Sequence, residues 1–329
     1  MTRLRALTLG RGIIAAVALA WLALPFPASA QSYPSRTITI VVGYAPGGTG
    51  DFIARVIGNK LSEKFGRTVV VENRAGASGL IAAQGVVNAA PDGYTILAGQ
   101  TPEIAINPTF LNSGFDPARD LKPIALGGIV PLALVVPKDA PYDTIKGLLD
   151  ASHSAKGLLF ASAGTGTPGH FAGEVLKRES RGNMTHVPYK GAAPALADLL
   201  GSHVDFYFPG TPAALPYVKA GQMKMLAVST VRRTATAPDV PTVVEATSIK
   251  DFDFSLWGGF FAPRRTPDDV VATLNAAINE ALALPDIKQK MADAGADIVP
   301  MSVAQFTAFM QAESEKYARI IRETGIKPE

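Results

Sequence analysis

The sequence predicts an α/β protein with two lobes, each containing a parallel-rich sheet. Short apolar runs of strand length alternate with segments whose apolar residues recur at helical spacing, and this alternation is typical of parallel sheets with helical crossovers. The chain has 329 residues, which suits two domains with separate cores. A content of 47% hydrophobic and 18% charged residues excludes a disordered chain, and the absence of cysteine excludes a disulfide-stapled one.

The elements follow one another in a regular order. Six apolar runs have the composition of buried strands, and they occupy residues 37–44, 68–72, 94–98, 158–162, 204–208 and 225–229. Four segments with helical spacing lie between them, at residues 51–65, 80–90, 168–180 and 192–201. The C-terminal helix has clear limits, because Ser302 and Gln305 can form a capping box at its start and Gly325 is suited to end it.

Two further strand candidates, residues 129–136 and 252–262, are longer, contain proline or glycine, and lack a helix immediately before them. We expect these two strands to cross between the lobes. The first lobe would then comprise residues 31–131 plus 254–329, and the second lobe residues 132–253. Lobes joined in this way enclose a ligand cleft between them.

The first thirty residues have the order of a secretory signal peptide. Arg3, Arg5 and Arg11 precede an apolar run at residues 13–24, and the small residues Ala28-Ser29-Ala30 follow it. Because this run is short for a membrane span, we expect cleavage after Ala30 and export to the periplasm. Removing the three arginines leaves 28 basic and 28 acidic residues, so the formal charge of +3 becomes zero and no nucleic-acid partner is expected.

Four loops that join a strand to the following helix share one composition, and they span residues 44–51, 99–102, 162–168 and 209–212. Their small residues let a ligand approach main-chain N–H groups at a helix N-terminus, where the helix dipole favours an anion. We expect Thr101 to cap its helix and Pro102 to occupy the first helical position. Since lysine and arginine are scarce in these loops, the pattern suits a small carboxylate better than a polyphosphate.

Other side chains near these loops allow two interpretations. Asp51 either complements the first turn of its own helix or accepts a hydroxyl or ammonium group of a ligand. His170 lies in the first turn of its helix and could donate to a ligand. Tyr44, Tyr189 and Phe208 could line the cleft, although aromatic residues near strand ends more often belong to the core.

Signatures of catalysis and of cofactors are weak. Residues 164–169 match the spacing G-x-G-x-x-G, but the acidic residue expected after the next strand is missing, so we expect no dinucleotide. The four histidines lack the spacing of a metal site, and we expect neither metal nor cofactor. The alternative to a binding protein is an exported α/β hydrolase, with Ser78 or Ser162 as nucleophile and His170 or His186 as base.

Six segments occur together, in order, from about residue 33 to the C-terminus. They are Tyr33-Pro34-Ser35-Arg36, Pro46-Gly47-Gly48-Thr49-Gly50-Asp51, Val71-Glu72-Asn73-Arg74-Ala75-Gly76-Ala77, Ala90-Pro91-Asp92-Gly93-Tyr94-Thr95, Gly166-Thr167-Pro168-Gly169-His170-Phe171-Ala172-Gly173-Glu174 and Val187-Pro188-Tyr189-Lys190-Gly191. In this combination the chain resembles the Bug family of exported solute-binding proteins, which are the extracytoplasmic receptors of tripartite tricarboxylate transporters.

The resemblance implies a type II periplasmic-binding-protein fold without enzymatic activity, which closes on a carboxylate held largely by main-chain groups and bridging waters. It implies the membrane subunits of such a transporter as partners, and we expect a monomer. Carried over by position, the ligand contacts are Tyr44, Gly47, Gly48, Thr49, Asp51, Gln100, Thr101, Ser162, Gly164, Thr165, Gly166 and Thr167.

One departure from the family pattern bears on the ligand. Many relatives have an acidic and an amide residue after the strand that contains Val204-Asp205, where this chain has Pro209-Gly210. The less polar wall favours a larger or aromatic carboxylate over a small polar one, so we expect a dicarboxylate or an aromatic carboxylate. A receptor that signals to a sensor protein without transport is a further alternative.

Overall fold

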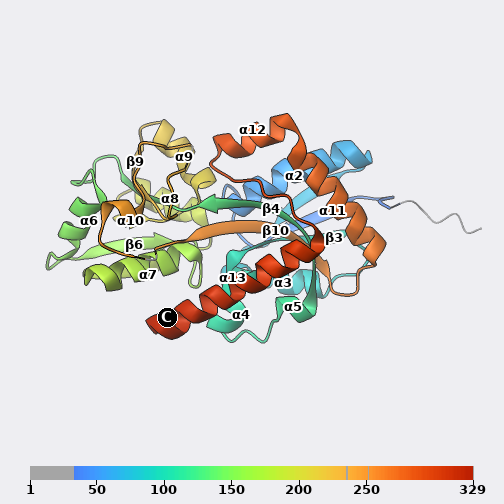
Figure 1. The fold of residues 1–329 in the computed structure, drawn as a ribbon, viewed down its shortest axis with the longest axis horizontal. Coiled ribbons are helices and arrows are strands. Elements are labelled where there is room, and N and C mark those ends of the chain that lie inside the picture. The colour runs from blue at the N-terminus through green and yellow to red at the C-terminus, as the bar shows by residue number, and fades with distance from the viewer. Residues whose placement is uncertain (1–32, 235, 251, 329) are drawn as a thin grey trace, which may run out of the picture. The chain divides into compact units, whose positions relative to one another are not determined.

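The strands lie in two five-stranded sheets (Figure 1). The computed structural model describes residues 33–234, 236–250 and 252–328, so the expected signal peptide lies outside the described residues. All elements discussed below belong to one compact unit that begins at Arg36.

The first sheet has the strand order β2-β1-β3-β10-β4. Its strands are β1 (Ile38–Val42), β2 (Val69–Asn73), β3 (Thr95–Gln100), β4 (Leu121–Pro131) and β10 (Ser255–Pro263). The strand β1 pairs in parallel with β2 and β3, whereas β10 runs antiparallel to β3 and β4. Most of β1 is buried, as expected for a central strand that is covered on both faces.

The second sheet has the order β7-β6-β8-β5-β9. Its strands are β5 (Ala133–Pro137), β6 (Leu158–Ser162), β7 (Met184–Pro188), β8 (Phe206–Tyr207) and β9 (Met223–Val228). The strand β6 is parallel to β7 and β8, while β5 is antiparallel to β8 and β9. Both sheets are therefore mixed with a parallel part, and the predicted α/β class is confirmed.

The helices fill the connections between these strands. They are α2 (Thr49–Phe65), η1 (Ala77–Gly79), α3 (Leu80–Val87), η2 (Pro102–Ile106), α4 (Asn107–Phe110), α5 (Pro117–Asp120), α6 (Ile145–Ser152), α7 (Pro168–Ser180), α8 (Ala192–Leu200), α9 (Thr211–Lys219), α10 (Val243–Ala246), α11 (Asp268–Ala283), α12 (Pro285–Asp293) and α13 (Val303–Thr324). The predicted limits of α13 are confirmed, since Ser302 and Gln305 form the capping box and Gly325 adopts a left-handed conformation after the last turn. In Figure 1, α11 lies beside α2. The C-terminal helix α13 packs against η2 and β4.

The expected crossing at residues 129–136 does pass from the first sheet to the second, but it is made by two strands rather than one. The strand β4 ends at Pro131 in the first sheet, and β5 begins at Ala133 in the second. Between them, the Leu132 N–H donates to Ser229 Oγ at 2.9 Å, and the Leu132 carbonyl accepts from the Ser229 N–H at 3.0 Å. Leu132 also pairs with Gly210 in an isolated antiparallel bridge, so the backbone stays paired where the chain changes sheets.

The second crossing also begins later than expected. The strand β10 starts at Ser255 and stays in the first sheet. Ser229 meets this crossing too, because its carbonyl accepts from the Phe254 N–H at 3.1 Å and its hydroxyl donates to the Phe254 carbonyl. One fully buried serine thus joins both passages between the sheets. The predicted lobe boundaries near residues 131 and 254 stay a prediction.

Candidate ligand-binding site

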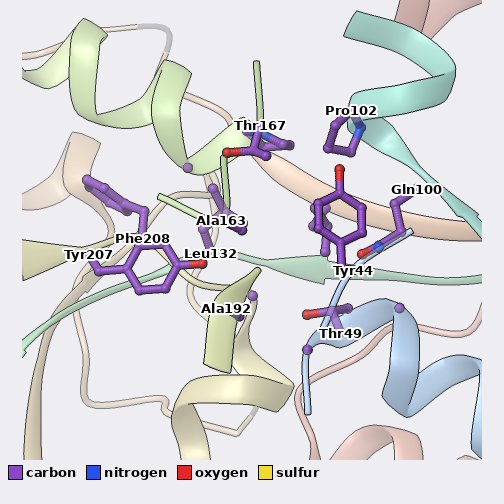
Figure 2. A pocket seen from close by; sticks show the side chains of 16 residues that line it. Tyr44, Thr49, Gln100, Pro102, Leu132, Ala163, Thr167, Ala192, Tyr207 and Phe208 are labelled. Atoms are coloured by element: carbon purple, nitrogen blue, oxygen red, sulfur yellow. The ribbon is translucent and has the colours of Figure 1, made fainter. Parts of the chain in front are cut away.

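Residues from both sheets enclose one small cavity. It is lined by Tyr44, Gly48, Thr49, Gly50, Gln100, Pro102, Leu132, Ala163, Thr167, Pro168, Gly169, Ala192, Tyr207, Phe208, Gly210 and Leu256. Figure 2 shows Tyr44, Thr49 and Gln100 on one side and Tyr207 and Phe208 on the other.

The N-termini of three helices meet at this cavity without a side-chain cap. The first residues of α2, α8 and α9 follow Gly48, Gly191 and Gly210, and none of these glycines has a side chain that could accept from the helix. All three glycines are buried. Because the first N–H groups of a helix have no partner within it, a buried and uncapped N-terminus needs water or a ligand. The cavity is therefore suited to an anion.

The polar side chains that line the cavity are neutral. Within the described part of the chain, the Thr49 hydroxyl and the Gln100 carboxamide make no hydrogen bond to protein, although both residues are at most 4% exposed. Burial raises the pKa of both Tyr44 and Tyr207, so their hydroxyls stay protonated near neutral pH. No charged residue and no histidine is among the described residues that line this cavity. An anion held here would be bound by dipoles and hydroxyls rather than by a cation.

The partners of Asp51 lie on α2, in the loop before it and at the end of β2. Its carboxylate accepts from the Gly47 N–H at 3.0 Å and from Asn73 Nδ2 at 3.0 Å, and it pairs with Arg55 at 2.8 Å. Burial by itself would raise the pKa of Asp51, but these hydrogen bonds outweigh it and hold that pKa below its usual value. These contacts favour the interpretation in which Asp51 stabilises the start of α2.

The loop before α7 is held by two histidines. Ser162 Oγ lies 2.6 Å from His186 Nε2 and donates to the Gly164 carbonyl at 3.0 Å. The His186 ring stacks on His170 with centroids 4.1 Å apart, and His170 Nδ1 accepts from the Gly166 N–H. Burial lowers the pKa of His186 to about 4. A second cavity lies beside the first and is lined by Tyr44, Gly164 and Tyr189 among others. Since Ser162 is fully buried and lines neither cavity, the serine–histidine pair supports the loop.

A strained turn reaches from the first sheet to the second. Ala77 and Ser78 both have positive φ angles, of 46° and 48°, which are costly for residues other than glycine. The Ser78 hydroxyl donates to the Thr165 carbonyl at 2.5 Å, and the Ser78 carbonyl accepts from the Tyr44 hydroxyl at 2.9 Å. The turn thus links the loop before α7 to a residue of the cavity wall.

The predicted site residues fall into three groups. Those that line the cavity are Tyr44, Gly48, Thr49, Gln100, Thr167 and Phe208. Those that line the neighbouring cavity are Tyr44, Gly164, Thr165 and Tyr189. Those that line neither are Gly47, Asp51, Thr101, Ser162, Gly166 and His170. Their roles toward a ligand stay predictions.

Thr101 does not cap its helix. Its backbone is helical, and its hydroxyl accepts from the Trp257 N–H of β10 at 2.9 Å. Thr167, by contrast, accepts from the His170 N–H as predicted. The sequence reasoning missed the N-terminus of α8 and the apolar residues Leu132 and Leu256 of the wall. A glycine directly before a helical segment, as at Gly191, was the available signal for α8.

The residues described by the structure include no group of three or more histidine, aspartate or glutamate side chains that could hold a metal ion. Within those same residues, no helix has both the length and the apolar character needed to cross a membrane.

The fold and the cavity define a solute-binding protein built from two sheets. Residues 53–326 match the family described as "Tripartite tricarboxylate transporter family receptor". The chain belongs to this family. It is 33% identical over 330 residues to the Protein BugT of Bordetella pertussis, covering 99% of both chains.

Solved structures of similar proteins have the same fold. The structure "R. palustris Rpa4515 with adipate" superposes with a TM-score of 0.87 at 33% identity, covering 90% of this chain and all of that one. MatC (Rpa3494) from Rhodopseudomonas palustris with bound malate has a TM-score of 0.81 at 32% identity, covering 88% of this chain and all of that one.

These relationships confirm the predicted family and the periplasmic-binding-protein fold. They also confirm that the chain is not an enzyme, because the family consists of receptors and the similar structures hold their solutes bound.

Proposed function

We propose that this receptor captures a small organic carboxylate in the cavity between its two sheets and delivers it to a tripartite tricarboxylate-type transporter. The observation that carries this proposal is the meeting of three buried, uncapped helix N-termini at one neutral cavity. Their N–H groups offer hydrogen bonds and a favourable dipole potential to an anion. The absence of charged residues from the described lining favours a small carboxylate over a polyphosphate.

The walls suggest which carboxylates fit. Tyr207, Phe208, Leu132 and Leu256 contribute apolar surface to the cavity. Adipate and malate are bound in two similar structures, and adipate has the longer apolar body. We therefore propose a dicarboxylate with an apolar chain or an aromatic carboxylate as the ligand. Thr49 and Gln100 would donate to its carboxylate, since neither side chain has a protein partner among the described residues.

The compartment and the partner follow from the family. Receptors of this family work with a membrane transporter, and the N-terminal sequence has the order of a signal peptide. We propose that the chain is cleaved after Ala30 and acts in the periplasm. N-terminal sequencing of the exported protein should give Gln31 as the first residue.

Thermal unfolding against a panel of acids tests the ligand. The panel holds adipate, malate, other C4–C6 di- and tricarboxylates, benzoate and nicotinate, with NAD as a control. A ligand at 100 times its dissociation constant adds ~2.7 kcal/mol to the stability, which is a shift of several degrees. A shift confined to one class of carboxylate would support the proposal. No shift for any acid, before and after unfolding and refolding to remove a resident ligand, would contradict it.

Two variants connect the shift to this cavity. Thr49→Ala removes the free hydroxyl at the start of α2. It should weaken the binding of the active acid about 10- to 150-fold, because one hydrogen bond to a charged group is worth about 1.5–3 kcal/mol. Thr185→Ala removes an exposed hydroxyl on β7 and serves as the control. If Thr49→Ala and Thr185→Ala bind the acid with equal affinity, the ligand does not bind beside Thr49.

A further inference from the structure

A carboxyl group is buried directly behind the cavity wall. Glu103 lies on η2 and is fully buried. Its Oε1 accepts from the Gln100 N–H at 2.7 Å, and its Oε2 lies 3.2 Å from the hydroxyl oxygen of Tyr44. Both of these partners line the cavity, whereas Glu103 does not. The carboxyl group thus holds two wall residues from behind.

Counting hydrogens indicates the protonation state of this carboxyl group. The Tyr44 hydroxyl has one hydrogen, and the Ser78 carbonyl, which has none to give, can accept it at 2.9 Å. The Ser78 carbonyl also accepts from Asn107 Nδ2 at 3.1 Å, so the single Tyr44 hydrogen can serve either Ser78 or Glu103. A protonated Glu103 lets both Tyr44 contacts be hydrogen bonds, because the carboxyl group then supplies the second hydrogen. Burial acts in the same direction, because it raises the pKa of Glu103 to about 8.

Hydrogen bonds from the main-chain N–H groups of Gln100 and of Glu103 itself act to lower the pKa of Glu103, but they only partly offset the effect of burial. The elements packed against η2 or in contact with it are η1, β3, α4 and α13. The first three have no ionisable side chains. From α13 comes Glu313, which bonds Trp257 Nε1 at 3.0 Å and Lys316 at 2.8 Å. Tyr44 is the titratable group that touches Glu103, and Tyr207 raises the pKa of Tyr44 further.

We propose that Glu103 holds a proton at physiological pH and, as a neutral acid, positions Tyr44 and Gln100 in the cavity wall. The neutral group donates to Tyr44 and accepts from Gln100, so each atom has a partner. With the ionised group, the single Tyr44 hydrogen would serve either Glu103 Oε2 or the Ser78 carbonyl, and the other contact would have no hydrogen. The ionised group would also place a negative charge one side chain away from the cavity. Glu103 is a positioning residue, since it reaches a ligand only through these two partners.

The decisive experiment needs no ligand. A single proton that the folded state holds and the unfolded state releases makes the folding equilibrium constant fall about tenfold per pH unit. For Glu103 this fall covers the range from its ordinary pKa of 4.5 to about 8, and it levels off above that. Glu103→Gln keeps both hydrogen bonds, because its oxygen accepts from Gln100 and its amide donates to Tyr44. Unfolding by urea at pH 5 to 9 should show this fall in the wild type and not in Glu103→Gln.

A control and a direct measurement complete this test. Glu63→Gln changes an exposed glutamate of α2 and should keep the wild-type profile. Carbon-13 NMR of glutamate-labelled wild-type protein should show one glutamate carboxyl group that remains protonated at pH 7, and this signal does not depend on a variant that folds. Identical pH profiles of the wild type and Glu103→Gln, or the absence of such a carboxyl signal, would overturn the proposal.

A second measurement concerns the ligand and rests on the proposed function. With adipate as the probe, affinity should fall at least tenfold between pH 7 and pH 9 in the wild type and remain constant in Glu103→Gln. Equal losses in the two proteins would overturn the link between Glu103 and the cavity. If adipate fails to bind at pH 7, adipate is not the ligand, and only the proposed function is affected. The proposal for Glu103 is tested separately, by the pH profile of unfolding without ligand.

Discussion

Gly210 lies where the second sheet touches the first, and its replacement tests whether the two sides of the cavity separate. A Cβ atom at this position would lie 2.2 Å from Thr49 Oγ1 and 3.2 Å from Val130 Cγ2. The backbone angles of Gly210, φ −62° and ψ 141°, are ordinary for alanine. Gly210→Ala therefore introduces no strain within its own loop. It introduces a clash only when the loop before α9 rests against α2.

The size of the effect follows from this overlap. A separation of 2.2 Å is well below any real Cβ contact, so one side must shift. Overpacking of this kind costs about 1–3 kcal/mol. If the sides part in the unliganded protein, the whole cost falls on the bound state, and affinity drops about 5- to 150-fold. The stability of the unliganded protein should then change little.

Isothermal titration calorimetry with the strongest acid of the panel measures the affinity, and urea unfolding without ligand measures the stability. Thr49→Ala leaves only a Cβ atom, 3.4 Å from the new methyl group, so the double variant with Gly210→Ala should recover part of the loss. Positive coupling between the two substitutions is the expected signature. If the unliganded Gly210→Ala protein loses as much stability as it loses binding free energy, the contact between Gly210 and Thr49 is present without ligand. The prediction that the two sides separate would then be refuted.

Three further substitutions have outcomes that the contacts determine. Thr167→Ala removes the cap of α7 and should lower the free energy of unfolding by about 1 kcal/mol, as measured by urea denaturation at pH 7. Ser229→Ala leaves the buried Leu132 N–H without its acceptor and should cost about 1–3 kcal/mol in the same assay, more than an exposed serine replaced by alanine. Folding lowers the pKa of Asp51, so its contribution to folding stability is present above its ordinary pKa of 3.8 and is lost as the pH falls below that value. Asp51→Asn should therefore be less stable than the wild type at pH 7. It should lose less stability than the wild type on acidification to pH 3.

The sequence predicted an element correctly where its limits depend on residues close to it in the chain. The limits of β6 and α7 were predicted correctly, because an apolar run is followed by small residues and by a threonine–proline pair that starts a helix. The same pair at Thr101 and Pro102 misled the prediction. There the hydroxyl of Thr101 bonds Trp257, a residue 156 positions further along the chain, and no local pattern reports that contact.

Long-range pairing also explains what was missed at the crossings and in the cavity. Residues 129–136 look like one strand, but the chain changes sheets at Leu132, which bonds Ser229 and pairs with Gly210. The protonated state inferred for Glu103 depends on Tyr44 and Ser78, which come from two other elements. The four small-residue loops could be recognised from the sequence, because glycine, threonine and proline directly before a helical segment are a local signal of a helix N-terminus.

The uncapped helix N-termini have a consequence for how such receptors diversify. Every residue other than proline has a main-chain N–H group, so a point substitution that preserves the fold hardly ever deletes these anion-binding groups. Substitutions of wall side chains, such as those of Leu132, Phe208 and Leu256, leave these N–H groups in place. Under the proposed function, single substitutions in the cavity walls can therefore change which solute is bound. The main-chain groups that bind the carboxylate are retained. Libraries that vary only these wall positions are a direct way to redirect the protein to a chosen acid.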